Sequence, residues 1–155
     1  MINRRMLLAA AFAALPAIGK QKSPGPFGLQ IYSLRGEAAK DLPTTLALIR
    51  KLGFNEVEVP ELYGRTAGEF RQLLDRAGLQ ATSMMAEYER LGKDADSVAA
   101  DAHALGAGYV VCSTIPHRKQ LTGDNMARAA EDFARWGKTL AGSGLHLCYH
   151  THGVE

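Results

Sequence analysis

Five short apolar runs carry the pattern of buried β-strands. Each is bounded by glycine or polar residues, and each has the length of an average strand. The first four begin about 25–28 residues apart. The runs are Phe27–Ser33, Asn55–Val59, Gln80–Met85, Gly108–Thr114 and Leu145–His150.

The stretches between these runs place apolar residues every three or four positions, the spacing of an amphipathic helix. Four helices are therefore expected. Asp41 and Asp124 are the expected N-caps of the first and fourth, and Thr66 with Glu69 forms a capping box before the second. The expected core positions are Leu42, Leu46, Ile49, Phe70, Leu73, Leu74, Ala77, Val98, Ala102, Leu105, Met126, Ala130, Phe133, Trp136 and Leu140.

The two kinds of connection differ in length. Each helix is followed by a short glycine turn to the next strand, which we term a helix return. Each strand is followed by a longer polar loop to the next helix, which we term a strand exit. This repeat is close to that of an eight-unit barrel of ~250 residues, whose active sites lie in the strand exits. The expected strand exits are Gly36–Lys40, Glu61–Arg65, Glu87–Lys93 and Ile115–Gly123.

The sequence therefore predicts an α/β fold, a parallel (β/α)8 TIM barrel of which this chain holds about five strands and four helices. The chemistry is expected at Tyr32–Arg35, Glu58–Tyr63, Met85–Arg90, Thr114–Lys119 and Tyr149–Glu155. A doubly wound sheet is the alternative, but it needs a Gly-x-Gly-x-x-Gly loop after the first strand. No such loop follows Ile31.

Composition narrows the class of protein. The 155 residues are 46% hydrophobic and 22% charged, which is ordinary for a globular protein, and the net charge is only +2. Without a basic stripe interleaved with aromatics, no nucleic-acid partner is expected. Cys112 and Cys148 lie in strand-like runs and lack the spacing of a zinc site, so buried thiols are expected, with a disulfide as the alternative.

The N-terminus has the layout of an export signal. In residues 1–19, Arg4 and Arg5 precede a short apolar run and then small residues, and Asn3–Leu8 resembles the twin-arginine motif. Residues 20–26 form a linker, and residues 27–155 the barrel portion. We expect export to the periplasm and no stable membrane anchor after signal removal. An uncleaved anchor helix is the alternative.

Several segments, in order, resemble the sugar phosphate isomerase/epimerase family of the xylose-isomerase-like barrel superfamily. The resemblance covers nearly everything from Phe27 to the end. The matching segments are Gly28–Arg35, Asp41-Leu42-Pro43, Gly53-Phe54-x-x-Val57-Glu58, Tyr63-Gly64, Leu74-Asp75-x-x-Gly78-Leu79 and Tyr149-His150-Thr151-His152-x-x-Glu155.

The resemblance implies a full barrel that binds one divalent metal (Mn, Mg, Co or Zn) and moves protons next to a sugar carbonyl. A divalent ion stabilises the negative charge that builds on the carbonyl oxygen. Family ligands lie at the ends of strands five to eight, so only the first can lie in this chain. His150 and Glu155 are the expected metal ligands and catalytic residues. Structural or surface histidines are the alternative.

The resemblance also implies contacts with the substrate. Glu58, Glu61, Tyr32, His117 and His152 are the candidates, against the simpler interpretation of solvated strand ends and loops. Two positions depart from the family pattern, because Met85 stands where relatives often carry histidine and Thr151 where they carry asparagine.

The expected function is that of an exported metal-dependent isomerase, epimerase or related lyase acting on a sugar or cyclitol. The chain alone is expected to be inactive, because the remaining ligands lie on strands it does not contain. A non-catalytic carbohydrate-binding barrel is the alternative. An apurinic endonuclease is disfavoured by the missing histidines and basic face. The expected partner is a small-molecule sugar, and self-association is left open.

Overall fold

The computed structural model describes residues 27–117 and 120–153. The expected export signal at 1–19, the linker at 20–26 and the candidate ligand Glu155 lie outside the described residues. Among the residues that are described, none of the helices has both the length and the apolar character needed to cross a membrane.

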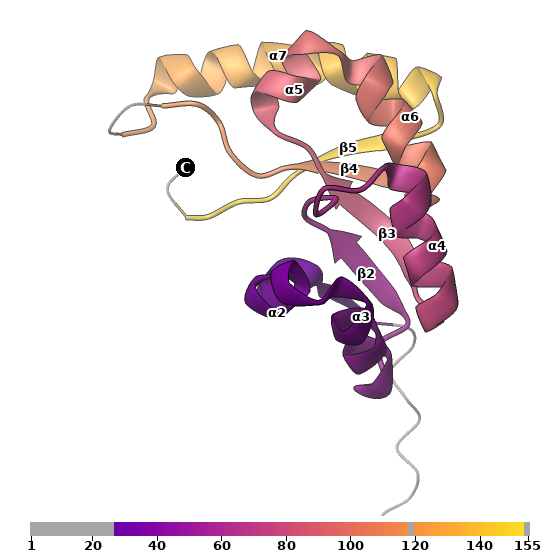
Figure 1. Cartoon of the computed structure of the whole chain (residues 1–155). Coiled ribbons are helices and arrows are strands. Elements are labelled where there is room, and N and C mark those ends of the chain that lie inside the picture. The colour runs from indigo at the N-terminus through magenta and orange to yellow at the C-terminus, as the bar shows by residue number, and fades with distance from the viewer. Residues whose placement is uncertain (1–26, 118–119, 154–155) are drawn as a thin grey trace, which may run out of the picture.

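Five strands form one parallel sheet whose spatial order is the order of the chain. A doubly wound sheet reverses its strand order at a switch point, and this sheet does not. Figure 1 shows the sheet curving, with the longer helices along its outer side. The parallel α/β prediction is therefore confirmed. The strands are β1 (Gly28–Gln30), β2 (Glu56–Val59), β3 (Gln80–Met85), β4 (Tyr109–Cys112) and β5 (His146–Tyr149).

The four expected helices are present, and two short ones add to them. The four are α3 (Leu42–Lys51), α4 (Ala67–Ala77), α6 (Ala95–Leu105) and α7 (Gly123–Gly142). The additional ones, α2 (Arg35–Lys40) and α5 (Tyr88–Lys93), occupy strand exits that were expected to be loops. That expectation was wrong because each short helix buries an apolar side chain, Ala38 in α2 and Leu91 in α5.

The first strand is shorter than its apolar run. Residues Ile31–Leu34 form a 3-10 helix, η1, so the chain turns away from the sheet after Gln30. Ile31 is fully buried under this turn. Within the expected run Phe27–Ser33, only Gly28–Gln30 is strand and only Ile31 is buried.

The helix caps are partly as expected. The Asp41 carboxylate accepts a hydrogen bond from the Thr44 backbone N–H at 3.1 Å, and Thr66 and Glu69 form the capping box. The prediction that Asp124 is the N-cap of α7 was wrong. Thr122 caps α7, because its hydroxyl accepts from the Asn125 N–H while the Asn125 side chain accepts from the Thr122 N–H.

The core lies between the sheet and the outer helices. Val57 and Val59 alternate along β2 with half-buried residues, whereas Val110 on β4 is followed by two further buried residues, and all three valines are at most 1% exposed. Phe70 on α4 is fully buried in the same core. Met126, expected in this core, is 38% exposed, since it lies before the first buried residue of α7.

Three helix returns share one hydrogen-bond pattern. Gly78, Gly106 and Gly144 adopt positive φ values of 70°, 78° and 74°. In each, the N–H of the following residue bonds a carbonyl in the last helical turn, as in Leu79 to Leu74 at 3.0 Å. This is the usual glycine stop of a helix. The residue after each glycine enters the core.

The two cysteines are free thiols, so the disulfide alternative is wrong. They lie on neighbouring strands, but Cys112 pairs with Tyr149 and Cys148 pairs with Val111. Because successive residues point to opposite faces of a strand, this offset places the two sulfurs on opposite faces of the sheet. Cys112 is fully buried and Cys148 is half-buried.

Candidate functional site

Three polar side chains from neighbouring strands meet on the inner face of the sheet. Gln30, Glu58 and Ser83 occupy paired positions on β1, β2 and β3. The Gln30 amide donates to Glu58 Oε1 at 2.6 Å, and the Ser83 hydroxyl donates to Glu58 Oε2 at 2.7 Å. Both oxygens of a carboxylate on the inner face of the sheet are thus bound by neutral donors.

A register shift makes this arrangement. Val57 pairs with Ala81, but Glu58 pairs with Ser83, so Thr82 is an extra residue on β3. The Thr82 hydroxyl donates back to the Val57 carbonyl at 3.3 Å. Bulges of this kind re-aim side chains next to functional sites. Here the bulge brings the Ser83 hydroxyl to Glu58.

A cavity of about 580 Å³ opens beyond these residues, at the carboxyl ends of β2, β3 and β4. It contains the predicted residues Tyr32 and Glu61 and draws on four strand exits. Its position is the one expected for the active site of a parallel barrel. The lining residues are Tyr32, Pro60, Glu61, Met85, Ala86, Glu87, Tyr88, Glu89, Ser113 and Thr114.

Tyr32 forms one wall of this cavity and is 51% exposed. The Arg35 guanidinium lies over its ring, 4.4 Å from the centroid, and also donates to the Tyr32 carbonyl at 3.1 Å. These contacts hold the ring of Tyr32 in place.

The opposite wall is the short helix α5, which contacts α7 through Tyr88. The Tyr88 ring packs edge-on against Trp136 at 4.7 Å, and its hydroxyl donates to Asp132. Burial, and then the hydrogen bond to Asp132, raise the pKa of Tyr88 to about 12. The same hydrogen bond lowers the pKa of Asp132. The phenol therefore stays protonated and keeps donating.

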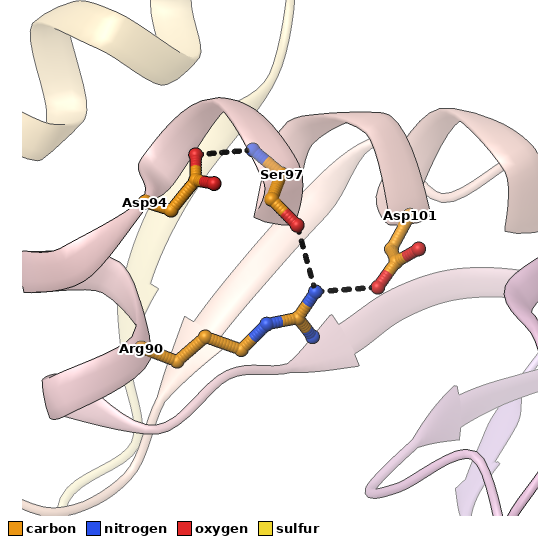
Figure 2. Close-up of polar contacts among 4 residues, drawn as sticks. All are labelled: Arg90, Asp94, Ser97 and Asp101. Carbon is orange, nitrogen blue, oxygen red and sulfur yellow. Dashed lines mark hydrogen bonds and ion pairs between the residues drawn. The ribbon is translucent and has the colours of Figure 1, made fainter.

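Helix α5 is also tied to α6. Figure 2 shows the Arg90 guanidinium reaching Asp101 at 2.5 Å and the Ser97 hydroxyl at 3.4 Å. Ser97 in turn donates its backbone N–H to Asp94, the N-cap of α6. Together with Tyr88, these contacts fix the helix that carries part of the cavity wall.

Tyr63 is the strained residue of the second strand exit. Its φ of 49° is positive, which is uncommon for a residue other than glycine. Its hydroxyl is buried without a hydrogen-bond partner, and its ring stacks on Phe70 at 6.4 Å. Burial, followed by the negative charge of Glu61, raises the pKa of Tyr63. Strain of this kind is typical of functional loops.

The candidate histidines lie at the ends of β4 and β5. The rings of His150 and His152 are 4.8 Å apart, and the His150 backbone bonds to Cys112. His117 and His152 line a second cavity of about 310 Å³, which shares Ser113 and Thr114 with the first. The His117 ring nitrogen Nδ1 lies 2.7 Å from the Ile115 carbonyl oxygen.

The structure thus divides the predicted site residues. Tyr32 and Glu61 line the larger cavity, whereas His117 and His152 line the smaller one. Glu58 is bound within the sheet beside them, and His150 lines neither cavity. Sequence reasoning placed chemistry in Met85–Arg90 but singled out no acidic residue there. The carboxylates of Glu87 and Glu89 in that exit were the available signal.

Several solved structures have the same arrangement of strands and helices. A sugar phosphate isomerase/epimerase from Parabacteroides distasonis ATCC 8503 matches with a TM-score of 0.69 and 22% identity, over 88% of this chain and 54% of that one. A xylose isomerase-like TIM barrel protein from Mycobacterium smegmatis in complex with magnesium matches with a TM-score of 0.63 and 16% identity, over 83% and 56%. The chain has the fold of the xylose isomerase-like TIM barrels.

An L-ribulose 3-epimerase shares this fold, with a TM-score of 0.60 and 18% identity, over 78% of this chain and 48% of that one. The chain thus spans about half the length of these xylose isomerase-like barrels. No protein-family model matches the sequence, and no curated protein matches it at a significant level.

A divalent ion such as the magnesium bound to the Mycobacterium smegmatis xylose isomerase-like barrel needs several ligands. Across residues 27–117 and 120–153, no three His, Cys, Asp or Glu side chains come together closely enough to hold a metal ion. His150 and His152 offer only a pair of imidazoles. The described residues therefore do not complete a metal site by themselves.

Proposed function

We propose that this chain is part of an exported sugar or cyclitol isomerase or epimerase that moves a proton next to a carbonyl. The observation that carries the proposal is the cavity of about 580 Å³ at the carboxyl ends of the strands. Its position in the fold supports a small-molecule site, and that fold is shared with an L-ribulose 3-epimerase.

The lining residues suit a polyhydroxylated ligand. Carboxylates such as that of Glu61 accept hydrogen bonds from sugar hydroxyls, and an aromatic ring such as that of Tyr32 offers a flat apolar surface to the C–H groups. In the proposal, Glu61 and Tyr32 contact the sugar directly. Glu58, held by Gln30 and Ser83, presents its carboxylate in one fixed geometry beside them.

The proposal assigns His150 and Glu155 as the first contributors to a divalent metal site. A bound divalent ion would stabilise negative charge on a carbonyl oxygen. The support is the resemblance of the segment Tyr149–Glu155 to its family counterpart and the magnesium bound to the Mycobacterium smegmatis protein. The chain's own carboxylates and imidazoles would bind the sugar and carry the proton.

Sugar binding by the 155-residue chain tests the proposal. We expect ligand-observed NMR to detect saturation transfer from the protein to free ketoses and aldoses. Glu61→Ala should weaken that transfer. Glu131→Ala is the matched control, because Glu131 is exposed on α7 and does not line this cavity. A chain that binds no sugar contradicts the proposal.

Met85 favours a second candidate, a carbohydrate-binding barrel without catalysis. Its sulfur accepts a hydrogen bond from Gln30 at 3.7 Å, at the end of β3 where relatives often carry histidine. The enzyme and the non-catalytic barrel can be distinguished by deuterium exchange from heavy water into the carbon next to the sugar carbonyl. The exchange is measured on a protein that contains all eight strands. Exchange with added Mg²⁺ or Mn²⁺ supports the enzyme, and binding without exchange supports the second candidate.

The export part of the proposal has its own test. Arg4→Lys combined with Arg5→Lys should keep the protein in the cytoplasm if the twin-arginine route is used. Lys51→Arg, an exposed change in α3, is the control. Immunoblots of periplasmic and cytoplasmic fractions give the measurement. Unchanged periplasmic delivery of the double variant would contradict this route.

A further inference from the structure

We propose that the larger cavity selects sugars that carry no phosphate or carboxylate group. This inference rests on the proposed function and deepens it, since it names the charge class of the substrate. It comes from the charges that surround the cavity and from the contacts that the nearest arginines already make.

The cavity wall carries three carboxylates. Glu61, Glu87 and Glu89 are exposed, and all three line the cavity. Its lining contains no lysine or arginine. Within the described part of the chain, none of the three carboxylates forms an ion pair. A ligand in this cavity would therefore lie next to three negatively charged side chains.

Two neighbouring groups register this negative potential. Besides burial, the charge of Glu61 raises the pKa of Tyr63. At Cys112, burial is the main cause of a raised pKa, and the charge of Glu89 adds to it. The carboxylates thus act on Tyr63 in the second strand exit and on Cys112 at the end of β4. A phosphate placed between them would meet the same repulsion.

Two guanidinium groups near the cavity are engaged in other contacts. Arg35 covers the ring of Tyr32 and donates to its carbonyl. Arg90 lines a smaller neighbouring cavity of about 270 Å³, but Figure 2 shows its guanidinium bound to Asp101 and Ser97 on α6. A phosphate group is usually bound by such cations or by backbone N–H groups at a helix N-terminus. The cavity lining offers no such cation, and the start of the short helix α5 in that lining carries two of the three carboxylates, Glu87 and Glu89.

A neutral sugar meets no such barrier. Its hydroxyl groups can donate to the carboxylates, and such charge-assisted hydrogen bonds are stronger than those between neutral groups. The ring surface of Tyr32 and the half-buried Met85 complete an amphipathic wall suited to a polyol. The same carboxylates that repel a phosphate therefore recognise a free sugar.

Paired ligands test the inference in the 155-residue chain. We compare D-glucose, D-fructose and D-xylose, each with its phosphate monoester, by ligand-observed NMR at low and high salt. We expect each free sugar to bind about tenfold more tightly than its phosphate, and this ratio to shrink at high salt because screening weakens the repulsion.

Variants assign the selectivity to the cavity. Glu61→Gln combined with Glu87→Gln should bring the two affinities together, and Glu61→Lys should bind the phosphate ester more tightly than the free sugar. Glu131→Gln, outside the cavity, should change neither. All these positions are exposed, so folding should be retained, and circular dichroism verifies it.

The outcomes separate the two claims. If phosphate esters bind the unmodified chain as tightly as the free sugars or more tightly, this inference is overturned while sugar binding stands. If selectivity for free sugars persists in the Glu61 and Glu87 variants, the carboxylates are not its cause and the inference is also overturned. If neither class of ligand binds, the proposed function itself fails.

Discussion

The two ends of the parallel strands are built in different ways. At the amino ends, the helix returns repeat one device: a glycine with positive φ, a hydrogen bond back to the last helical turn, and a buried residue such as Leu79. At the carboxyl ends, each strand exit is different. They contain the strained Tyr63, the short helix α5 and unpaired carboxylates.

This contrast separates stability from recognition. The helix returns satisfy their backbone groups and insert apolar side chains, so they contribute to folding. The strand exits leave the buried hydroxyl of Tyr63 unbonded, which folding alone would not favour, and they place exposed carboxylates around a cavity, where pairing would add little stability. Substitutions in the helix returns should therefore have large effects on stability. Substitutions in the strand exits should have large effects on ligand binding.

The largest effect is expected at a helix return. Leu105 is fully buried just before Gly106, so Leu105→Ala should destabilise the chain by about 2–5 kcal/mol. Leu52 also precedes a glycine with positive φ, Gly53, but is 60% exposed. Leu52→Ala should cost less than about 0.5 kcal/mol. Urea unfolding measures both, and equal losses would contradict the assignment of the core.

A smaller loss is expected from the glycine itself. Gly106 has a φ of 78°, and a Cβ there would lie 2.1 Å from the Arg71 guanidinium, which bonds the Leu105 carbonyl. Gly106→Ala should therefore cost about 1–2 kcal/mol. Gly137→Ala, in open space within α7, should instead stabilise by roughly 0.5–1 kcal/mol. Thermal unfolding compares the two variants. A Gly106→Ala variant as stable as the wild type would contradict the stabilising role given to the helix returns.

At the strand exits, α5 should show a pH signature. The folded pKa of Tyr88 is raised to about 12 from an ordinary value of 10.0, so its contribution to stability is complete below about pH 10 and is lost as the pH rises towards 12. Tyr88→Phe should flatten the fall of stability in this window, whereas Tyr109→Phe should not. Urea midpoints across the window give the measurement, and identical pH profiles for wild type and Tyr88→Phe would contradict the burial of the Tyr88 hydroxyl and its bond to Asp132.

The smallest effect on stability is expected from the cavity carboxylates. Glu61→Gln and Glu87→Gln should each change the free energy of unfolding by less than about 0.5 kcal/mol, because the side chains are exposed and unpaired. The same variants should alter ligand binding. A clear loss of stability in either variant would contradict the claim that the strand exits serve binding and the helix returns serve stability.

Local signals in the sequence predicted most of the fold. The Thr66 and Glu69 capping box, the Asp41 cap and the glycines that end α4 and α6 each act through residues close in the chain. Because these contacts span only a few residues, their pattern can be seen without knowing the tertiary structure. The parallel sheet then followed from strands alternating with helices.

Other features depend on contacts between distant segments. The choice of Thr122 over Asp124 was set by reciprocal bonds with Asn125, and Met126 lies beyond the part of α7 that meets the core. Helix α5 forms because Leu91 is buried and because Tyr88 bonds Asp132, which lies far along the chain. A short polar stretch gives little sign of such partners.

The sequence predicted where in the fold the candidate site lies better than it predicted which side chains contact one another there. Tyr32 and Glu61 line one cavity, since strand exits of a parallel sheet meet at one edge, and their roles as substrate contacts stay predictions. The pairing of Glu58 with Ser83 depends on a register shift that the sequence does not reveal. The roles proposed for His150 and Glu155 stay predictions, because no complete ligand set forms among the described residues.

The sheet order has a consequence for how the chain acquires its structure. Every strand pairs only with its neighbours in sequence, and the widest separation between paired residues is that of Tyr109 with His146. Loop closure between successive units therefore costs little entropy compared with pairing strands that lie far apart in the chain. Each strand can add to those already formed as the chain leaves the ribosome, so assembly can advance one unit at a time from β1.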